Sequence, residues 1–261
     1  MRLNAGSTAV TVEIEEGGIS LIRITDNGCG IAKQDVENAF LRHFDQQNPQ
    51  CRGSDTFVFS WVPRRSVVEY FGSCKSGTDH KDKRRRIWDK IYHRRRKRKN
   101  AGGDRSADGT TFLVRQLFFN TPARRKFLKT PMTEASHISD LLTRLALSHP
   151  DISFRFINNG QVKLHTSGNG KMKDVIYHIY GREIANNLIS LEFEKDGVRL
   201  SGYLGKPVIN RGNRNFENYF VNGRYVRNSI LAKAIEDGYK DFTMQHRYPL
   251  LHSRLRSIRK N

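Results

Sequence analysis

Residues 109–128 have the sequence GTTFLVRQLFFNTPARRKFL. The first half of this stretch is rich in β-branched and aromatic residues, which predicts a strand over residues 111–117. A helix is expected from about residue 136, with Ser136 as its N-cap. Its apolar face consists of four residues with i, i+3, i+4, i+7 spacing: Ile138, Leu141, Leu142 and Leu145.

Upstream of this stretch, residues 9–25 predict a β-hairpin, because apolar and polar residues alternate on both sides of a Glu-Glu-Gly-Gly turn. The sequence Asp-Asn-Gly-Cys-Gly follows at residues 26–30. A carboxylate at a strand end can accept a hydrogen bond from an exocyclic amine, and glycines let a flat base approach the backbone. The motif therefore suits adenine, although such a turn is also common as a purely structural feature.

Downstream of residue 128, strands and helices are mixed. Two hairpins are expected to turn at residues 158–160 and 196–197, with a helix through residues 175–180 between them. A strand over residues 219–221 and a helix over residues 229–239 follow. This mixture predicts the α+β class.

The composition fits a chain with a sizeable core, since 37% of its 261 residues are hydrophobic. No apolar run approaches the roughly 20 residues that cross a bilayer, and the N-terminus lacks the order of a signal peptide. The three cysteines have no metal-ligand spacing and indicate a reduced compartment. We therefore expect a cytoplasmic protein with no membrane contact and no cysteine-bound metal.

The charge is large and unevenly distributed. A formal net charge of +20 points to a polyanionic partner such as nucleic acid. Residues 44–107 supply about half of this excess, mainly through the basic runs at 83–86 and 94–99, and the last ten residues add about four charges. Residues 44–108 show no sustained strand or helix period, so no regular fold is expected there.

A third motif, YFVNGRYVRN, occupies residues 219–228. Together with residues 26–30 and 109–128, and in the same order, it resembles the MutL family of DNA mismatch repair proteins. The resemblance covers about residues 3–43 and 109–249. The related ATPases gyrase B and Hsp90 share only the first of the three motifs.

The resemblance implies both a fold and a function. The fold is a GHKL-type α/β sandwich, incomplete here, followed by an α/β domain like domain 2 of ribosomal protein S5. The family binds ATP with Mg²⁺ and closes as a clamp on DNA, which couples mismatch recognition by a MutS-type protein to repair. Its homodimers form mainly through a region C-terminal to these motifs, so dimerisation through this part of the chain is not expected.

The resemblance also implies roles for individual residues. Asp26 would hold the adenine amine, with Gly28 and Gly30 beside the base and Thr110 near the nucleotide. Two further residues, Arg224 and Arg227, stand where the family presents cations to the phosphates of mismatched duplex DNA, a sequence-independent contact. The simpler interpretation of this arginine pair is a solvated surface.

Several family features are missing from the sequence. Met1 stands at the position of the Mg²⁺-binding asparagine, and no residue matches the general base. The family's lid motif, Gly-Phe-Arg-Gly-Glu-Ala-Leu, does not follow His43, and its phosphate-sensing lysine is absent. We therefore expect no catalytic residue, no metal ligand, doubtful binding of ATP and Mg²⁺, and no ATP hydrolysis by this copy.

Single-base shifts of the reading frame offer one explanation. Codons for residues 60–68 can be chosen so that the shifted frame encodes LGFRGEAL. Codons for residues 250–261 can likewise encode FTALTLTIDTE after one added base, which has a strand alternation that the tail itself lacks. The alternative is a genuine basic arm, in which case the chain is a non-catalytic nucleic-acid-binding protein that uses residues 83–99.

The sequence thus predicts five segments. They are a partial ATP-binding domain at 1–43, an aberrant basic segment at 44–108 that is out of frame and disordered, the end of the ATP-binding domain with a connection at 109–130, an S5-like DNA-contacting domain at 131–249, and an aberrant basic tail at 250–261.

Overall fold

The computed structural model describes residues 6–28, 92–93, 110–119, 121–244 and 246–257. The chain divides into two compact units. The first unit contains Arg2–Leu142 and Ile152–His165, and the second contains Thr143–Asp151 and Thr166–Asn261. Each unit has one mixed sheet with helices, which confirms the α+β class. None of the helices in the described ranges is long and apolar enough to span a bilayer.

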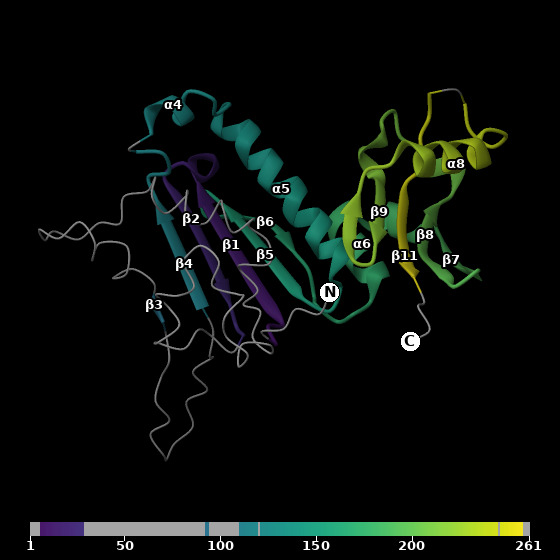
Figure 1. Ribbon diagram of the computed structural model, residues 1–261, viewed down its shortest axis with the longest axis horizontal. Coiled ribbons are helices and arrows are strands. Elements are labelled where there is room, and N and C mark those ends of the chain that lie inside the picture. Colours follow the sequence, from purple (N-terminus) through teal and green to yellow (C-terminus); the bar gives the residue numbers. More distant parts are fainter. Residues whose placement is uncertain (1–5, 29–91, 94–109, 120, 245, 258–261) are drawn as a thin grey trace, which may run out of the picture. The chain divides into compact units, whose positions relative to one another are not determined.

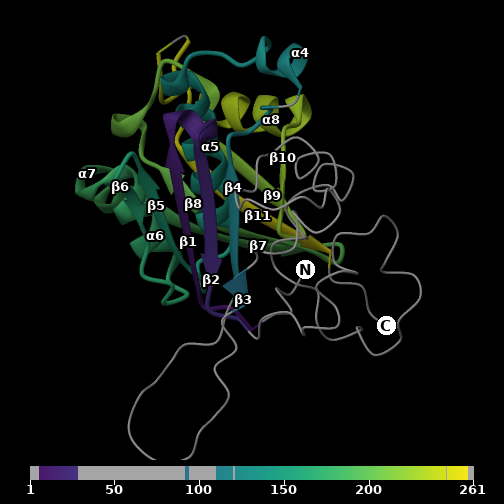
Figure 2. The ribbon, with the colours of Figure 1, turned by 90° about the vertical axis from the view of Figure 1, so that its left-hand side faces the viewer.

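The first unit is built on a six-stranded sheet (Figures 1 and 2) with the order β3-β4-β2-β1-β5-β6. β1 pairs antiparallel with β2 and parallel with β5, so the predicted hairpin over residues 9–25 is confirmed. The strands are β1 (Ala9–Glu15), β2 (Leu21–Asp26), β3 (Tyr92–His93), β4 (Thr110–Arg115), β5 (Ser153–Asn158) and β6 (Gln161–His165).

One face of this sheet is apolar. Val10 and Val12 of β1 lie beside Phe154 and Phe156 of β5, and all four side chains are buried. Burying each such side chain contributes about 1.5–3 kcal/mol. The predicted turn at residues 158–160 is also present, since β5 and β6 form an antiparallel hairpin.

Helix α5 (Pro131–Ser148) starts earlier than the sequence predicted. Ser136 lies inside the helix, so its assignment as the N-cap is wrong. The Thr130 hydroxyl instead accepts from the N–H three residues later at 3.3 Å, and the Glu134 carboxylate accepts from the N–H of Lys129 at 2.8 Å. A proline at the first helical position favours this start, because its fixed φ suits the helix and it has no N–H to satisfy. The short helix α4 (Pro122–Arg125) precedes α5.

The predicted domain boundary at residue 131 does not match the structure. β5 and β6, at residues 153–165, belong to the first sheet, because the phenylalanines of β5 extend the apolar face of β1 and β6 pairs with β5. The second sheet begins only at β7, which starts at Leu188.

The second unit has a five-stranded sheet with the order β10-β9-β11-β8-β7. Its hairpins turn at Asp196-Gly197, as predicted, and at Asn222-Gly223, where positive φ angles favour glycine and asparagine. The strands are β7 (Leu188–Lys195), β8 (Val198–Gly205), β9 (Glu217–Val221), β10 (Arg224–Val226) and β11 (Leu251–Ser257). The helices are α6 (Met172–Tyr180), α7 (Arg182–Asn186) and α8 (Ser229–Tyr239), with two 3-10 turns, η5 (Pro207–Ile209) and η6 (Arg214–Phe216).

Both segments expected to be aberrant contribute strands. Tyr92–His93 pairs with Thr110 and Thr111 of β4, while the rest of residues 44–108 lies outside the described residues. The tail forms β11, which lies between β8 and β9, so the expectation that it lacks strand character is wrong. Its alternation was missed because leucine and serine alternate with histidine and arginine along the strand, whereas pattern analysis looks for apolar residues that alternate with polar ones.

Arg254 of β11 closes the end of α5. Its Nη2 donates to the carbonyl oxygens of Leu147 and Ser148, at 2.8 and 2.9 Å. The last carbonyls of a helix have no partner within the helix and carry partial negative charge. The guanidinium therefore satisfies both the hydrogen-bonding and the electrostatic requirement of this helix end.

His252 of β11 is buried without a hydrogen bond. Only 2% of its surface is exposed, it packs 5.1 Å from the Phe220 ring, and neither ring nitrogen has a partner among the described residues. Burial, helped by the positive charge of Arg254, lowers the pKa of His252 to about 3. The imidazole is therefore neutral in the folded protein at ordinary pH.

We predict that acid destabilises the second unit through His252. The unfolded chain takes up this proton near pH 6.5 and the folded chain only near pH 3, so stability falls as pH drops between these values, by about 1.4 kcal/mol per pH unit. Denaturant unfolding from pH 8 to 4 measures the slope, and His252→Leu should reduce it. An identical slope in this variant would contradict the assignment. His149 has a pKa lowered by burial too and should keep a smaller acid sensitivity in the variant.

Candidate functional site

Asp26 lies at the end of β2, on the apolar face of the first sheet. It is opposite Val10 of β1 and only 6% of its surface is exposed. One carboxylate oxygen accepts from the N–H of Gly28 at 2.8 Å. The expected adenine-binding carboxylate is therefore held rigidly where the strand turns away from the sheet.

Thr110 lies at the same end of the neighbouring strand. Thr25 of β2 pairs with Thr111 of β4, and their hydroxyls are 3.2 Å apart. The next position along each strand holds Asp26 and Thr110, so the two expected nucleotide residues share one end of the β2–β4 ladder. Gly30 lies outside the described residues.

Asn27 holds this end together, although its position in a common Asn-Gly turn did not single it out in the sequence. Its Oδ1 accepts from the N–H groups of Thr8 and Ala9, both at 2.9 Å, and from the Ser7 hydroxyl at 3.1 Å. Its Nδ2 donates to the Thr8 hydroxyl at 2.8 Å. One exposed amide thus fixes the turn after β2 to the start of β1.

A second cluster surrounds the β9–β10 hairpin of the second unit. The Ser148 hydroxyl at the end of α5 donates to the carbonyl of Gly223 at 2.6 Å. The Arg144 guanidinium lies 4.7 Å from the centre of the Tyr225 ring, a cation–π distance. Arg227 Nε donates to the Tyr225 hydroxyl at 3.4 Å.

Arg224 and Arg227 are both exposed at this hairpin. Arg144 joins them through Tyr225 and was missed by the sequence analysis, because it is about 80 residues away and sits in an ordinary helical pattern. Arg144 and Arg227 therefore both contact Tyr225, and the exposed Arg224 precedes it in the hairpin.

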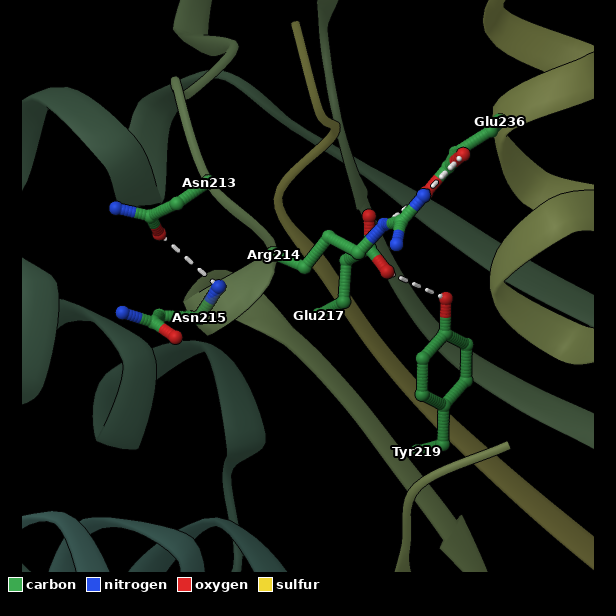
Figure 3. A network of polar contacts seen from close by, with 6 residues as sticks. All are labelled: Asn213, Arg214, Asn215, Glu217, Tyr219 and Glu236. Carbon is green, nitrogen blue, oxygen red and sulfur yellow. Dashed lines mark hydrogen bonds and ion pairs between the residues drawn. The ribbon is translucent and has the colours of Figure 1, made fainter. Parts of the chain in front are cut away.

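Figure 3 shows a polar network on η6, β9 and α8. Arg214 Nη2 donates to the Glu236 carboxylate at 2.9 Å, and the Tyr219 hydroxyl donates to Glu217 at 3.0 Å. Burial raises the pKa of Glu217. The described residues contain no group of three histidine, cysteine, aspartate or glutamate side chains that could hold a metal. We interpret this network as a link between the sheet and α8.

The sequence of the chain is similar to those of known proteins from one family. The family described as DNA mismatch repair protein, C-terminal domain, matches residues 176–257. MutL of Agathobacter rectalis is 50% identical over 95% of this chain, and MutL of Clostridium botulinum is 40% identical over 95%. The chain belongs to the MutL family of DNA mismatch repair proteins. It spans 38% and 37% of the length of these two relatives.

Solved structures agree with the MutL fold. The Aquifex aeolicus MutL ATPase domain complexed with ADP has a TM-score of 0.62 at 23% identity, covering 98% of this chain and 86% of that one. The B-subunit of DNA gyrase from Myxococcus xanthus has a TM-score of 0.51 at 11% identity, covering 96% and 74%. At these identities the likeness concerns the fold, and it confirms the expected GHKL-type architecture. The MutL match reaches Ser257 and so includes β11.

We predict that Asn27→Ala loosens the end of the first unit that contains Asp26. Loss of the amide removes its ties to β1, and we expect about 1–2 kcal/mol of destabilisation, since each such hydrogen bond contributes about 1 kcal/mol. Denaturant unfolding followed by circular dichroism measures this. Asn27→Asp keeps the acceptor and loses the donor, so it should lose less. Equal stability of the alanine variant and the unmodified chain would contradict the role.

Proposed function

We propose that this MutL-family chain binds the backbone of duplex DNA through the β9–β10 hairpin, as one part of a mismatch repair clamp. The observation that carries this proposal is the contact of Arg144 and Arg227 with Tyr225, beside the exposed Arg224 of the same hairpin. A MutS-type partner and a cytoplasmic location, both expected from the family, belong to the same proposal.

The hairpin is suited to phosphate rather than to base recognition. Guanidinium groups bind phosphate oxygens with paired N–H donors, and such contacts carry affinity without sequence information. The Tyr225 ring and the Ser148 hydroxyl hold the hairpin in place, so few side chains must be ordered when DNA binds. Preorganisation of this kind lowers the entropic cost of association.

We further propose that the end of β2 recognises adenine. The buried Asp26 carboxylate is an acceptor for an exocyclic amine, and Gly28 presents no side chain towards a base. These residues fit the adenine part of ATP. In the family, bound ATP with Mg²⁺ supplies the energy for clamp closure.

The phosphates of ATP lack the binding motif that the family resemblance leads us to expect. The lid motif expected after His43 is not found in residues 44–108. Without this lid motif, the charge of the β- and γ-phosphates would be poorly neutralised. We therefore propose that this chain holds adenine but does not hydrolyse ATP.

Duplex DNA binding tests the hairpin. We expect the double variant Arg224→Glu, Arg227→Glu to bind at least ~10-fold more weakly, and to reduce the dependence of log K on log salt by about 2, because two phosphate contacts are lost. Fluorescence anisotropy over a salt series measures both quantities.

The matched control for this experiment is Arg182→Glu, which removes an exposed arginine from α7 of the same unit. It should change affinity little. A double variant that binds as tightly as the control would instead place DNA binding in the basic run at 83–99, which lies almost entirely outside the described residues.

Nucleotide binding tests the adenine site. We expect adenosine and ATP to bind with similar affinity, since the phosphates add little, and Asp26→Asn to abolish both, because the amide replaces one acceptor oxygen with a donor. Isothermal calorimetry measures the affinities, with Asp140→Asn on the exposed side of α5 as control. ATP binding far tighter than adenosine binding, or ATP turnover by the purified chain, would contradict the proposal.

A further inference from the structure

β7 (Leu188–Lys195) is an edge strand, because no strand within the described ranges pairs with its outer side. Ile189, Leu191 and Phe193 share one face of it, and Ile189 and Phe193 expose 48% and 56% of their surface. An edge strand of eight residues with an exposed apolar row is a template for pairing with another chain.

The sequence of β7 is self-complementary in one antiparallel register. Side chains alternate between the two faces of a strand, and residues directly opposite each other share a face. Two copies therefore keep their apolar rows on the same face only if some residue lies directly opposite the same residue of the partner; this residue is called the centre of the register. With Leu191 at the centre, Ile189 lies opposite the partner's Phe193 and the apolar row is continuous. Such a pairing is closed and two-fold symmetric.

Neighbouring registers are disfavoured by charge or by loss of contact. A centre at Glu192 puts two glutamates directly opposite, and a centre at Phe193 puts Glu192 opposite the partner's Glu194. Like charges in such positions are destabilising. A centre at Ser190 leaves Phe193 without an apolar partner, so the register centred on Leu191 is selected.

The other face of β7 accepts the same register. Glu192 lies opposite the partner's Ser190, whose hydroxyl is a donor for the carboxylate. Glu194 is already paired within its own copy, since Arg199 Nε of β8 donates to its carboxylate at 2.9 Å. No charge on this face therefore meets another of the same sign.

We propose that the second unit pairs with a second copy of this chain through β7, centred on Leu191, contrary to the expectation from the family resemblance that this part of the chain does not dimerise. The strand matches itself in both apolar and charged positions, which distinguishes a second copy from an unrelated peptide. This inference goes beyond the proposed function, because it requires neither DNA nor nucleotide.

Disulfide cross-linking tests the register. In a background with Cys29, Cys51 and Cys74 replaced by serine, Leu191→Cys places two thiols opposite each other, and oxidation should yield linked dimers. Lys195→Cys, on the same strand and face, places them far beyond bonding range, so its dimer yield should be at least ~10-fold lower, as expected from disulfide geometry. Equal yields from both variants would overturn the register.

Sedimentation velocity tests the association itself. The unmodified full chain should show a dimer fraction that grows with concentration, and Phe193→Glu should abolish it. Val162→Glu is the matched control, because Val162 is 49% exposed on the edge strand β6 of the first sheet. A chain that is monomeric at every concentration, or a dimer that survives Phe193→Glu, would overturn the proposal. The cross-linking result stands even if the glutamate variant unfolds.

Discussion

The second unit depends on the pairing of β11 between β8 and β9. This strand, formed by the last described residues, holds the two halves of the sheet together. It also carries Arg254, whose guanidinium binds the end of α5. The end of α5 in turn supplies Ser148 and Arg144, which hold the β9–β10 hairpin. The arginines proposed to meet DNA are thus positioned by a chain of contacts that begins in β11.

The tail shows which kind of element could not be predicted from the sequence. Period-2 and period-3.6 patterns, together with turn residues, predicted both hairpins, the strand in residues 219–221 and helix α8, because these signals lie within short contiguous segments. β11 was missed because its inner positions include His252 and Arg254, which pattern analysis assigns to solvent. The α5 start was missed because Thr130 caps it from outside the apolar period.

The residues of the candidate sites also fall into those that the sequence could predict and those that it could not. Asp26 and Arg224 could be proposed because they lie in contiguous motifs. Asn27 and Arg144 act through partners far away in the sequence, or through a particular turn geometry, and only the fold brings these partners together. Contacts between distant residues leave no local signal in a single sequence.

The tail also bears on the reading-frame hypothesis. In the shifted frame, position 252 is alanine and position 254 is threonine. Alanine would remove a buried imidazole whose nitrogens have no partner among the described residues, a local conflict of the kind that selection removes. Threonine, however, is too short to replace the Arg254 contacts with α5. The two positions therefore point in opposite directions, while the family match to residues 176–257 includes the whole of β11.

The order of the second sheet connects the two surfaces proposed here. β10, whose hairpin is proposed to bind DNA, and β7, with the self-complementary row, are its opposite edges. Pairing through β7 would join two five-stranded sheets and leave both hairpins accessible at the outer edges. With strands about 4.8 Å apart, the outer edges would be separated by roughly 40 Å, close to one turn of duplex DNA. Two weak backbone contacts on one duplex reinforce each other when the geometry lets both bind at once. Self-association through β7 would therefore strengthen DNA binding without any new contact to DNA.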